Sequence, residues 1–181
     1  MSDLILRAAI PADAAAIAQV RVDSWRATYR GILPDADLDS MKLDESAALW
    51  ERILEAKSAA ASVFVAERDG AVLGFAAGKL LEEEKFGLNA ELAAIYMRPD
   101  AQRAGIGRRL VGKIAEAHQA HGAHGLIAWV LAKNEIARQF FEDLGAELLI
   151  EQPFTWNEEL ELVEAGYGWR DLNALLAVCG K

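Results

Sequence analysis

The chain has 181 residues, of which 53% are hydrophobic and 26% are charged, with only 4 prolines. This composition fits one globular domain and excludes intrinsic disorder and collagen-like repeats. The 28 acidic and 19 basic residues give a net charge of −9 at pH 7, which argues against nucleic-acid binding because such binding requires clustered positive charge.

The cysteine and histidine content argues against disulfides and metal sites. The single cysteine, Cys179, has no partner for an internal disulfide. His118, His121 and His124 lie three residues apart but have no Cys or carboxylate alongside, so we expect no metal. The N-terminus resembles no secretion signal, and no apolar run approaches the roughly 20 residues that a membrane helix requires. We therefore expect a cytoplasmic domain without a membrane partner.

Hydrophobic periodicity changes along the chain from helical spacing to the spacing of strands. In the first half it predicts a strand over residues 4–8, helices over 11–30 and 44–57, and strands over 63–68 and 72–76. Asp69-Gly70 between the last two strands predicts a hairpin, because glycine accommodates the positive φ of a tight turn. We expect the acidic stretch at 82–85 to be a solvent-exposed connector.

The second half alternates strands and helices. The pattern predicts a strand over 91–97, a helix over 105–121, a strand over 126–131, a helix over 135–144, and strands over 147–154 and 160–169. This order indicates one α/β domain over residues 4–172, followed by a tail over 173–181. We expect a mixed, mostly antiparallel sheet of about seven strands with flanking helices.

The most informative segment lies between the strand at 91–97 and the helix that follows it. Gly105 and Gly107 allow a tight turn whose backbone N–H groups join those of the helix start, which is an arrangement suited to a pyrophosphate. Two known phosphate loops do not match, because Ile114 replaces the Ser or Thr of a Walker A loop and Leu110 replaces the third Rossmann glycine. The alternative is a plain helix start in which the glycines only permit the turn.

The hexapeptide Gln102-Arg103-Ala104-Gly105-Ile106-Gly107 after a strand resembles the Arg/Gln-x-x-Gly-x-Gly/Ala signature of the GCN5-related N-acetyltransferase (GNAT) family. A second segment, from Asn134 to Phe140-Phe141 and Gly145, is similar to the Asn and Phe-Tyr-x-x-x-Gly-Phe pattern of that family. The resemblance extends over nearly the whole chain. Residues 22–34 also resemble one branch of bacterial acetyltransferases with unassigned acceptors.

The resemblance implies that acetyl-CoA is the acetyl donor and that no metal takes part. Backbone groups at the end of the central strand would bind the pantetheine arm, the glycine loop would bind the pyrophosphate, and Asn134 would bind the cofactor arm. The implied cofactor-binding residues are Ile95, Tyr96, Met97, Gln102, Arg103, Ala104, Gly105, Ile106, Gly107, Arg108, Asn134 and Phe141.

The resemblance also suggests acid–base groups. A protonated alkylamine must lose a proton before it attacks a thioester, so a nearby carboxylate is useful. Glu91 occupies the position where the family often carries this base, and uninterrupted strand alternation would place it on the same face as Ala93 and Ile95. The alternative is a structural Glu on the sheet. Phe141 replaces the tyrosine that usually protonates the departing thiolate, which leaves Tyr96, Tyr29, water or unassisted departure as alternatives.

Trp25 and Tyr29 lie four residues apart and share a helix face, where they form either an acceptor-pocket wall or core packing. Together these features predict an acetyl-CoA-dependent N-acetyltransferase. It would act by direct attack in a ternary complex on a primary amine of a small molecule, peptide or protein, and a homodimer is left open. One alternative is a noncatalytic acyl-CoA-binding or regulatory module. Another is an interaction domain that uses exposed Trp25, Trp50 and Trp156.

Overall fold

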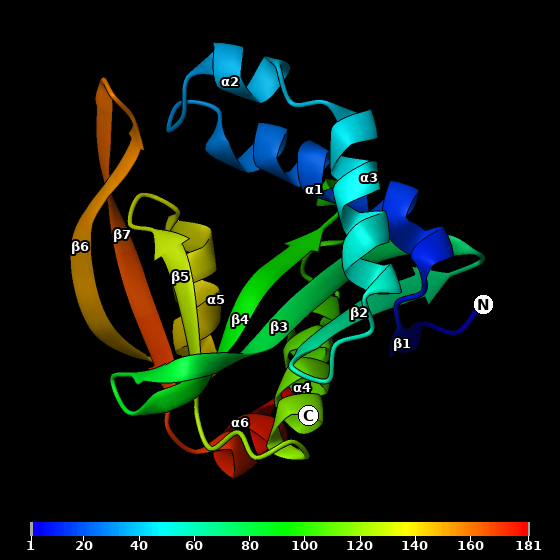
Figure 1. The fold of residues 1–181 in the computed structure, drawn as a ribbon, viewed down its shortest axis with the longest axis vertical. Helices are drawn as coiled ribbons and strands as arrows, with labels where there is room; N and C mark the ends of the chain where they lie inside the picture. Colours follow the sequence, from blue (N-terminus) through cyan, green and yellow to red (C-terminus); the bar gives the residue numbers. More distant parts are fainter. Residues whose placement is uncertain (1, 181) are drawn as a thin grey trace.

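A computed structural model describes residues 2–180 as one seven-stranded sheet with the strand order β1-β2-β3-β4-β5-β7-β6 (Figure 1). The strands are β1 (Ile5–Ala8), β2 (Ala61–Arg68), β3 (Ala71–Lys85), β4 (Leu88–Met97), β5 (Leu126–Leu131), β6 (Glu147–Asn157) and β7 (Leu160–Trp169). Every neighbouring pair is antiparallel except β4 and β5, which are parallel. The predicted mixed, mostly antiparallel sheet is therefore confirmed.

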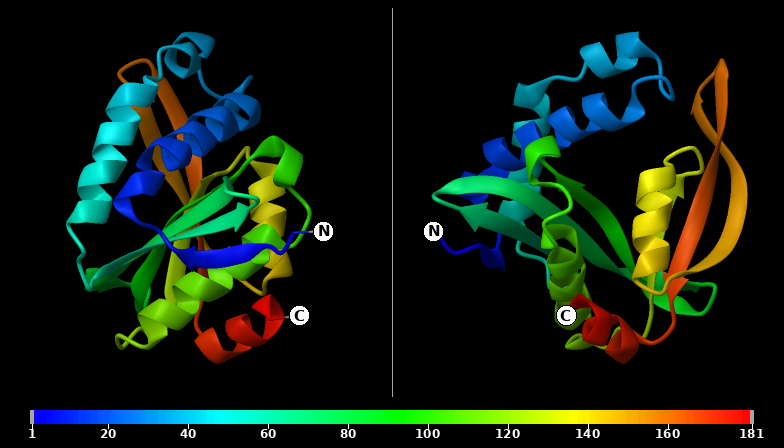
Figure 2. Two further views of the ribbon diagram at one scale, coloured as in Figure 1. Left: turned by 90° about the vertical axis from the view of Figure 1, so that its right-hand side faces the viewer. Right: turned by 180° about the vertical axis from the view of Figure 1, so that it is seen from behind.

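Helices cover both faces of the sheet, with α1 and α3 on one side and α4 and α6 on the other (Figure 2). The helices are α1 (Ala14–Tyr29), α2 (Asp35–Asp39), α3 (Leu43–Glu55), α4 (Ile106–Gln119), α5 (Glu135–Asp143) and α6 (Leu172–Cys179), with 3-10 turns η1 (Pro11–Asp13) and η2 (Pro99–Ala101). None of the helices within residues 2–180 is long and apolar enough to cross a membrane.

Two apolar clusters hold the layers together. On one face, Ile17 of α1 and Trp50 of α3 pack against the buried Phe75 of β3. On the opposite face, Leu110 and Ile114 of α4 pack against the sheet and α6. Fully burying a side chain of this size contributes about 1.5–3 kcal/mol, so both faces of the central strands are fixed in place.

The predicted connector at 82–85 is wrong, because β3 continues through Lys85. Phe86 and Gly87 both have positive φ, 55° and 75°, and form a tight turn that returns the chain into β4. Lys85 pairs with Leu88 across this turn. The polar sequence at 82–85 resembles a loop because its exposed side chains lack the apolar alternation of a half-buried strand.

A bulge interrupts β4 at the centre of the sheet. Gly78 pairs with Leu92 while Ala77 pairs with Ala94, so Ala93 is an extra residue without a partner on β3. On its other side β4 pairs with β5 only through residues 90–92. Beyond this point the two strands separate, as Figure 1 shows. We call residues 93–97 of β4 and 129–131 of β5 the fork.

The expected tail at 173–181 is also wrong, because α6 continues the domain to Cys179. The Asp171 side chain accepts a hydrogen bond of 3.0 Å from the Ala174 amide and so caps this helix. Leu175 and Cys179 are buried. A Cβ atom on Gly112 of α4 would lie 3.0 Å from the Cys179 Cβ atom, so the glycine permits close contact between the two helices.

His118 of α4 is 1% exposed, and its Nε2 atom lies 2.8 Å from the Ser62 hydroxyl of β2. Its Nδ1 atom has no hydrogen-bond partner within residues 2–180. His121 and His124 are exposed. Among the residues that the structure describes, no group of three His, Cys, Asp or Glu side chains is arranged to hold a metal ion. His118 is therefore a core residue that links α4 to the sheet.

Burial lowers the pKa of His118, which makes stability depend on pH. The unfolded chain binds a proton at this histidine below its ordinary pKa of about 6.5, whereas the folded chain resists protonation. We expect the free energy of unfolding to fall between pH 7 and pH 5, by at most about 1.4 kcal/mol per pH unit from this group. Urea titrations of the wild type, His118→Gln and the exposed control His121→Gln measure this slope. A steep slope that persists in His118→Gln would contradict the assignment.

Candidate active site

The fork opens at its β4 end onto the start of α4. Past Met97 the chain forms η2 and then a short loop in which Arg103 and Gly105 have positive φ, 65° and 76°. A Cβ atom on Gly105 would lie 3.6 Å from the Arg108 Nη2 atom, which is an ordinary contact, and no side chain caps the helix. The first amides of α4 therefore have no acceptor within the helix. They are available to an anion beside the fork.

Positive charge gathers at this helix start, although the whole chain is acidic. The first turn of α4 contains no acidic residue. Arg103 and Arg108 form no ion pair within residues 2–180, and the Arg108 Nε atom is buried without a partner. Free guanidinium groups and free amides together are the donor set that a pyrophosphate requires.

Gly107 brings α4 close to the end of β4. A Cβ atom at this position would lie 2.8 Å from the Met97 Cε atom and 3.2 Å from the Phe140 Cζ atom. Such a side chain would force the end of the Met97 side chain and the Phe140 ring to move. Gly105 and Gly107 therefore act differently, since the first permits the turn and the second permits the close packing.

The predicted Asn134 lies at the other side of the fork, just after β5. Its Oδ1 atom accepts a hydrogen bond of 3.2 Å from the Ala137 amide and caps α5. The Asn134 side chain also lies near the Tyr29 hydroxyl of α1, where it favours the ionised phenol. Residues from α1 and α5, distant in the sequence, therefore meet across the fork.

Four aromatic side chains, which we call the aromatic cluster, lie beside the fork: Trp25 and Tyr29 of α1, Tyr96 of β4 and Trp156 of β6. The ring centroid of Trp25 is 4.9 Å from that of Tyr29, 6.4 Å from that of Tyr96 and 6.0 Å from that of Trp156. The Ser24 hydroxyl donates a hydrogen bond of 2.7 Å to the Met97 carbonyl oxygen and ties α1 to β4. No local pattern around Trp156 predicts its place in this cluster.

The aromatic cluster contradicts the interpretation of the chain as an interaction domain with exposed tryptophans. Trp50 is buried, and Trp25 and Trp156 are half-buried against their neighbours. The Trp156 indole donates a hydrogen bond of 2.7 Å to Asp37 of α2. None of the three tryptophans is therefore exposed on the surface as that interpretation required.

The expectation that Glu91 shares a face with Ile95 is wrong, because it assumed that β4 alternates without interruption. The bulge at Ala93 reverses the alternation, so Ile95 packs with the cluster under α4 while Tyr96 packs on the α1 side. Glu91 shares the α1 side of the sheet with Tyr96. Its side chain is 16% exposed, and its Oε2 atom lies 3.5 Å from the Nζ atom of Lys79. Glu91 is therefore on the same face as the aromatic cluster.

Comparisons with known proteins agree with this geometry. Residues 20–146 match the sequence model described as the acetyltransferase (GNAT) family. The chain belongs to this family. It is 38% identical over 161 residues to the uncharacterized N-acetyltransferase YuaI of Bacillus subtilis (strain 168), with 88% of each chain covered. The membership confirms the predicted enzyme class, an acetyl-CoA-dependent N-acetyltransferase.

Solved GNAT structures share the fold. The PaiA N-acetyltransferase of Thermoplasma acidophilum in complex with coenzyme A superposes with a TM-score of 0.71 at 19% identity, covering 90% of this chain and 98% of that one. YncA, a putative acetyltransferase from Salmonella typhimurium with its cofactor acetyl-CoA, gives a TM-score of 0.68 at 21% identity, covering 92% of this chain and 93% of that one.

Two tyrosines of this GNAT chain are available as proton donors. Burial raises the pKa of Tyr29 to about 12 and also raises the pKa of Tyr96. Both phenols therefore remain protonated at neutral pH. A neutral phenol beside the fork is able to donate a proton to a developing thiolate.

The structure does not place Phe141 in the fork as the family resemblance implied. Its side chain is 4% exposed, with its ring centroid 5.9 Å from that of Tyr167 and 5.5 Å from that of Trp169. Phe140 instead lies near Met97 and Gly107. Neighbouring helix positions are about 100° apart, so one phenylalanine enters the core and the other faces the start of α4.

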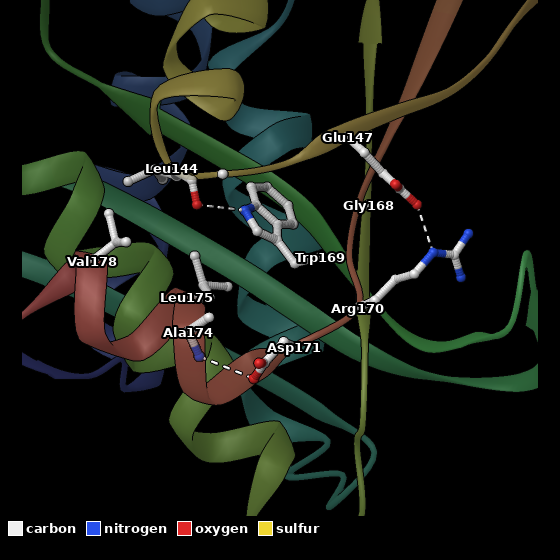
Figure 3. Close-up of a pocket in the computed structure, with 10 residues that line it drawn as sticks. Leu144, Glu147, Gly168, Trp169, Arg170, Asp171, Ala174, Leu175 and Val178 are labelled. Carbon is white, nitrogen blue, oxygen red and sulfur yellow. Dashed lines mark hydrogen bonds and ion pairs between the residues drawn. The ribbon is translucent and has the colours of Figure 1, made fainter.

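A separate hollow of about 280 Å³ lies between α6 and the end of β7 (Figure 3). The Trp169 indole donates a hydrogen bond of 3.1 Å to the Leu144 carbonyl oxygen at its wall. Leu175 and Val178 of α6 also line it. None of the predicted site residues borders this hollow, so it is not part of the active site.

Proposed function

We propose that the fork binds acetyl-CoA and that the aromatic cluster binds a primary amine, which is acetylated by direct attack in a ternary complex. The observation that carries this proposal is the arrangement around the fork. The start of α4, which can bind an anion, lies at one end of the fork. Glu91 lies on the face of the sheet that α1 covers, which is also the face of Tyr29 and Tyr96 of the aromatic cluster. A donor and an acceptor would therefore approach from different sides.

The residues present fit the proposed donor. Ile106, Gly107 and Arg108 would hold its pyrophosphate through free backbone amides, with Arg103 and Arg108 adding charge. Backbone groups of Ile95 and Met97, which β5 no longer pairs with, would hold the pantetheine arm. Acetyl-CoA would supply the acetyl group as an activated thioester. A backbone N–H of the fork would stabilise negative charge on its carbonyl oxygen.

The side chains on the α1 side of the sheet would supply the base and the acid of the reaction. The amine nitrogen forms the new bond to the carbonyl carbon, and the carbon–sulfur bond breaks. The Glu91 carboxylate accepts the proton that the amine loses, directly or through water. The thiolate receives a proton from a neutral tyrosine. Tyr29 suits this role because its hydroxyl lies near Asn134 at the fork.

We expect Tyr29→Phe to lower kcat by about 10²-fold, within the usual effect of a positioned acid. Tyr96→Phe is the matched control and should lower kcat less, because the Tyr96 ring packs between Trp25 and Phe75. Steady-state rates at saturating substrate measure both variants. A normal kcat in Tyr29→Phe would mean that water protonates the thiolate or that it leaves unassisted.

The proposed function is tested by thiol release from acetyl-CoA with a panel of primary amines, together with mass spectrometry of the acetylated product. Turnover that requires an amine supports the transferase. Tight acetyl-CoA binding by calorimetry without amine-dependent thiol release would instead support the noncatalytic binding module.

A further inference from the structure

Arg21 stacks against the aromatic cluster, and its guanidinium has no charged partner within residues 2–180. Its guanidinium carbon lies 4.6 Å from the centroid of the Trp25 ring, one helical turn further along α1. Arg21 is half-buried and follows the buried Ile17 by four residues and precedes the buried Ser24 by three, so the three residues share the face of α1 that packs against the sheet. Within residues 2–180 it forms neither an ion pair nor a side-chain hydrogen bond. A stacked guanidinium of this kind is preorganised to bind an anion.

The charge of Arg21 acts on two hydroxyl groups of the proposed acceptor site. It favours the ionised form of both Tyr29 and Tyr96 and so opposes the effect of burial on the pKa of each hydroxyl. The guanidinium therefore lies within electrostatic reach of the two phenols beside the fork. The helix start that would bind the donor phosphates has its own cations, Arg103 and Arg108.

A second donor in the aromatic cluster also has no partner. The Trp25 Nε1 atom is buried and has no acceptor within hydrogen-bond distance in residues 2–180, although it lies near the Tyr96 hydroxyl and favours its ionised form. A buried N–H group normally finds an acceptor, because leaving it unpaired costs stability. The Trp156 indole of the same cluster has such an acceptor in Asp37. The free indole N–H and the free guanidinium belong to side chains that stack on each other, so one ligand group can bind both.

We infer that the acceptor carries a carboxylate next to its primary amine, and that Arg21 and Trp25 bind this carboxylate. This inference rests on the proposed function and names its substrate class, the free α-amino acids. A carboxylate can accept two parallel hydrogen bonds from a guanidinium group and a further one from an indole N–H. The positive ammonium of the acceptor would face the other side of the site, where Glu91 is negative. The carboxylate of the amino acid would then lie near the positive Arg21 and its ammonium group near the negative Glu91.

The inference is tested with matched acceptors. The twenty free amino acids are screened for thiol release from acetyl-CoA, and the best acceptor is compared with its amide and its decarboxylated amine. We expect kcat/KM to be about 10²-fold higher for the amino acid than for either analogue, since each analogue leaves the charged donor unpaired. The amide also loses its ammonium proton more readily, so intrinsic reactivity favours the amide and works against the expected result.

Variants connect this selectivity to the side chains. Arg21→Gln should reduce the ratio of kcat/KM for amino acid over amide to near one, and Arg21→Lys should restore part of it. Trp25→Phe keeps a ring but removes the N–H, and should reduce the ratio by about tenfold. Arg52→Gln on the exposed surface of α3 is the matched control and should keep the wild-type ratio. Calorimetry should show wild-type acetyl-CoA affinity in Arg21→Gln.

Three results would overturn the inference. Equal kcat/KM for an amino acid and its decarboxylated amine would leave the transferase intact but exclude carboxylate recognition. A loss of acetyl-CoA affinity in Arg21→Gln would assign the cation to the donor. Acetyl-CoA binding without turnover of any amine would remove the proposed function and, with it, the acceptor class.

Discussion

Glu91→Gln should lower kcat/KM by about 10²–10⁴-fold at neutral pH, which is the usual effect of a positioned general base. The amide keeps the shape of the carboxylate and its hydrogen-bonding capacity but accepts no proton. Acetyl-CoA affinity should stay near the wild-type value, because the pyrophosphate loop lies beyond the other end of β4. Steady-state rates and calorimetry measure the two quantities separately.

The pH dependence of the rate deficit in Glu91→Gln identifies the role of Glu91. As pH rises toward the pKa of the amine, solvent supplies free amine and the base is needed less. The deficit of Glu91→Gln should therefore shrink as the pH increases. Glu82→Gln is the matched control, because Glu82 lies exposed on β3. A near-normal rate in Glu91→Gln would leave Glu91 as a structural partner of Lys79, and lost acetyl-CoA affinity would show that the substitution disturbed β4.

Gly105→Glu should weaken acetyl-CoA binding by at least tenfold. The new carboxylate would lie at the start of α4, where the free amides and arginines favour an anion. Like charges about 4 Å apart repel by about 1 kcal/mol in water and about 4 kcal/mol near a protein surface, and about 1.4 kcal/mol corresponds to a tenfold change in affinity. Isothermal calorimetry with acetyl-CoA measures the loss.

Backbone strain must be separated from charge in this test. Gly105 has φ of 76°, which an L-residue adopts only at a cost. Gly122 follows α4 at its opposite end with φ of 92°, and a Cβ atom there meets nothing within 4 Å. Gly122→Glu therefore imposes similar strain away from the fork and should retain acetyl-CoA affinity. Equal losses in both variants, or none in a folded Gly105→Glu, would argue against the anion site.

Local sequence patterns predicted most of the architecture. Strands β5 and β7 begin and end where alternation and turn residues indicated, and α4 follows the glycine loop as expected. Such elements are predictable because their periodicity and their end signals are contiguous in the chain. α2 was not predicted, since a helix of 5 residues carries too little periodicity to detect.

The face of Glu91 was not predictable in the same way. A bulge depends on how two strands pair, and nothing in residues 91–97 signals that Ala93 is the extra residue. The aromatic cluster has a similar origin, because Trp25 and Trp156 meet only after β6 has folded back toward α1. Phe141, which was expected to bind the cofactor, lies in the core, and the neighbouring Phe140 faces the start of α4 instead. Local sequence patterns therefore indicate the segments of the site but not the faces that these segments present.

The buried end of α6 has a practical consequence for assays that detect the release of coenzyme A by the enzyme. Cys179 is the only cysteine of the chain, and burial raises the pKa of its thiol to about 11. The thiolate is the reactive form, so a disulfide reagent such as DTNB added to the folded protein meets almost no reactive sulfur. Colour that develops during turnover then reports coenzyme A alone. Colour that develops slowly without substrate would report α6 detaching from Gly112.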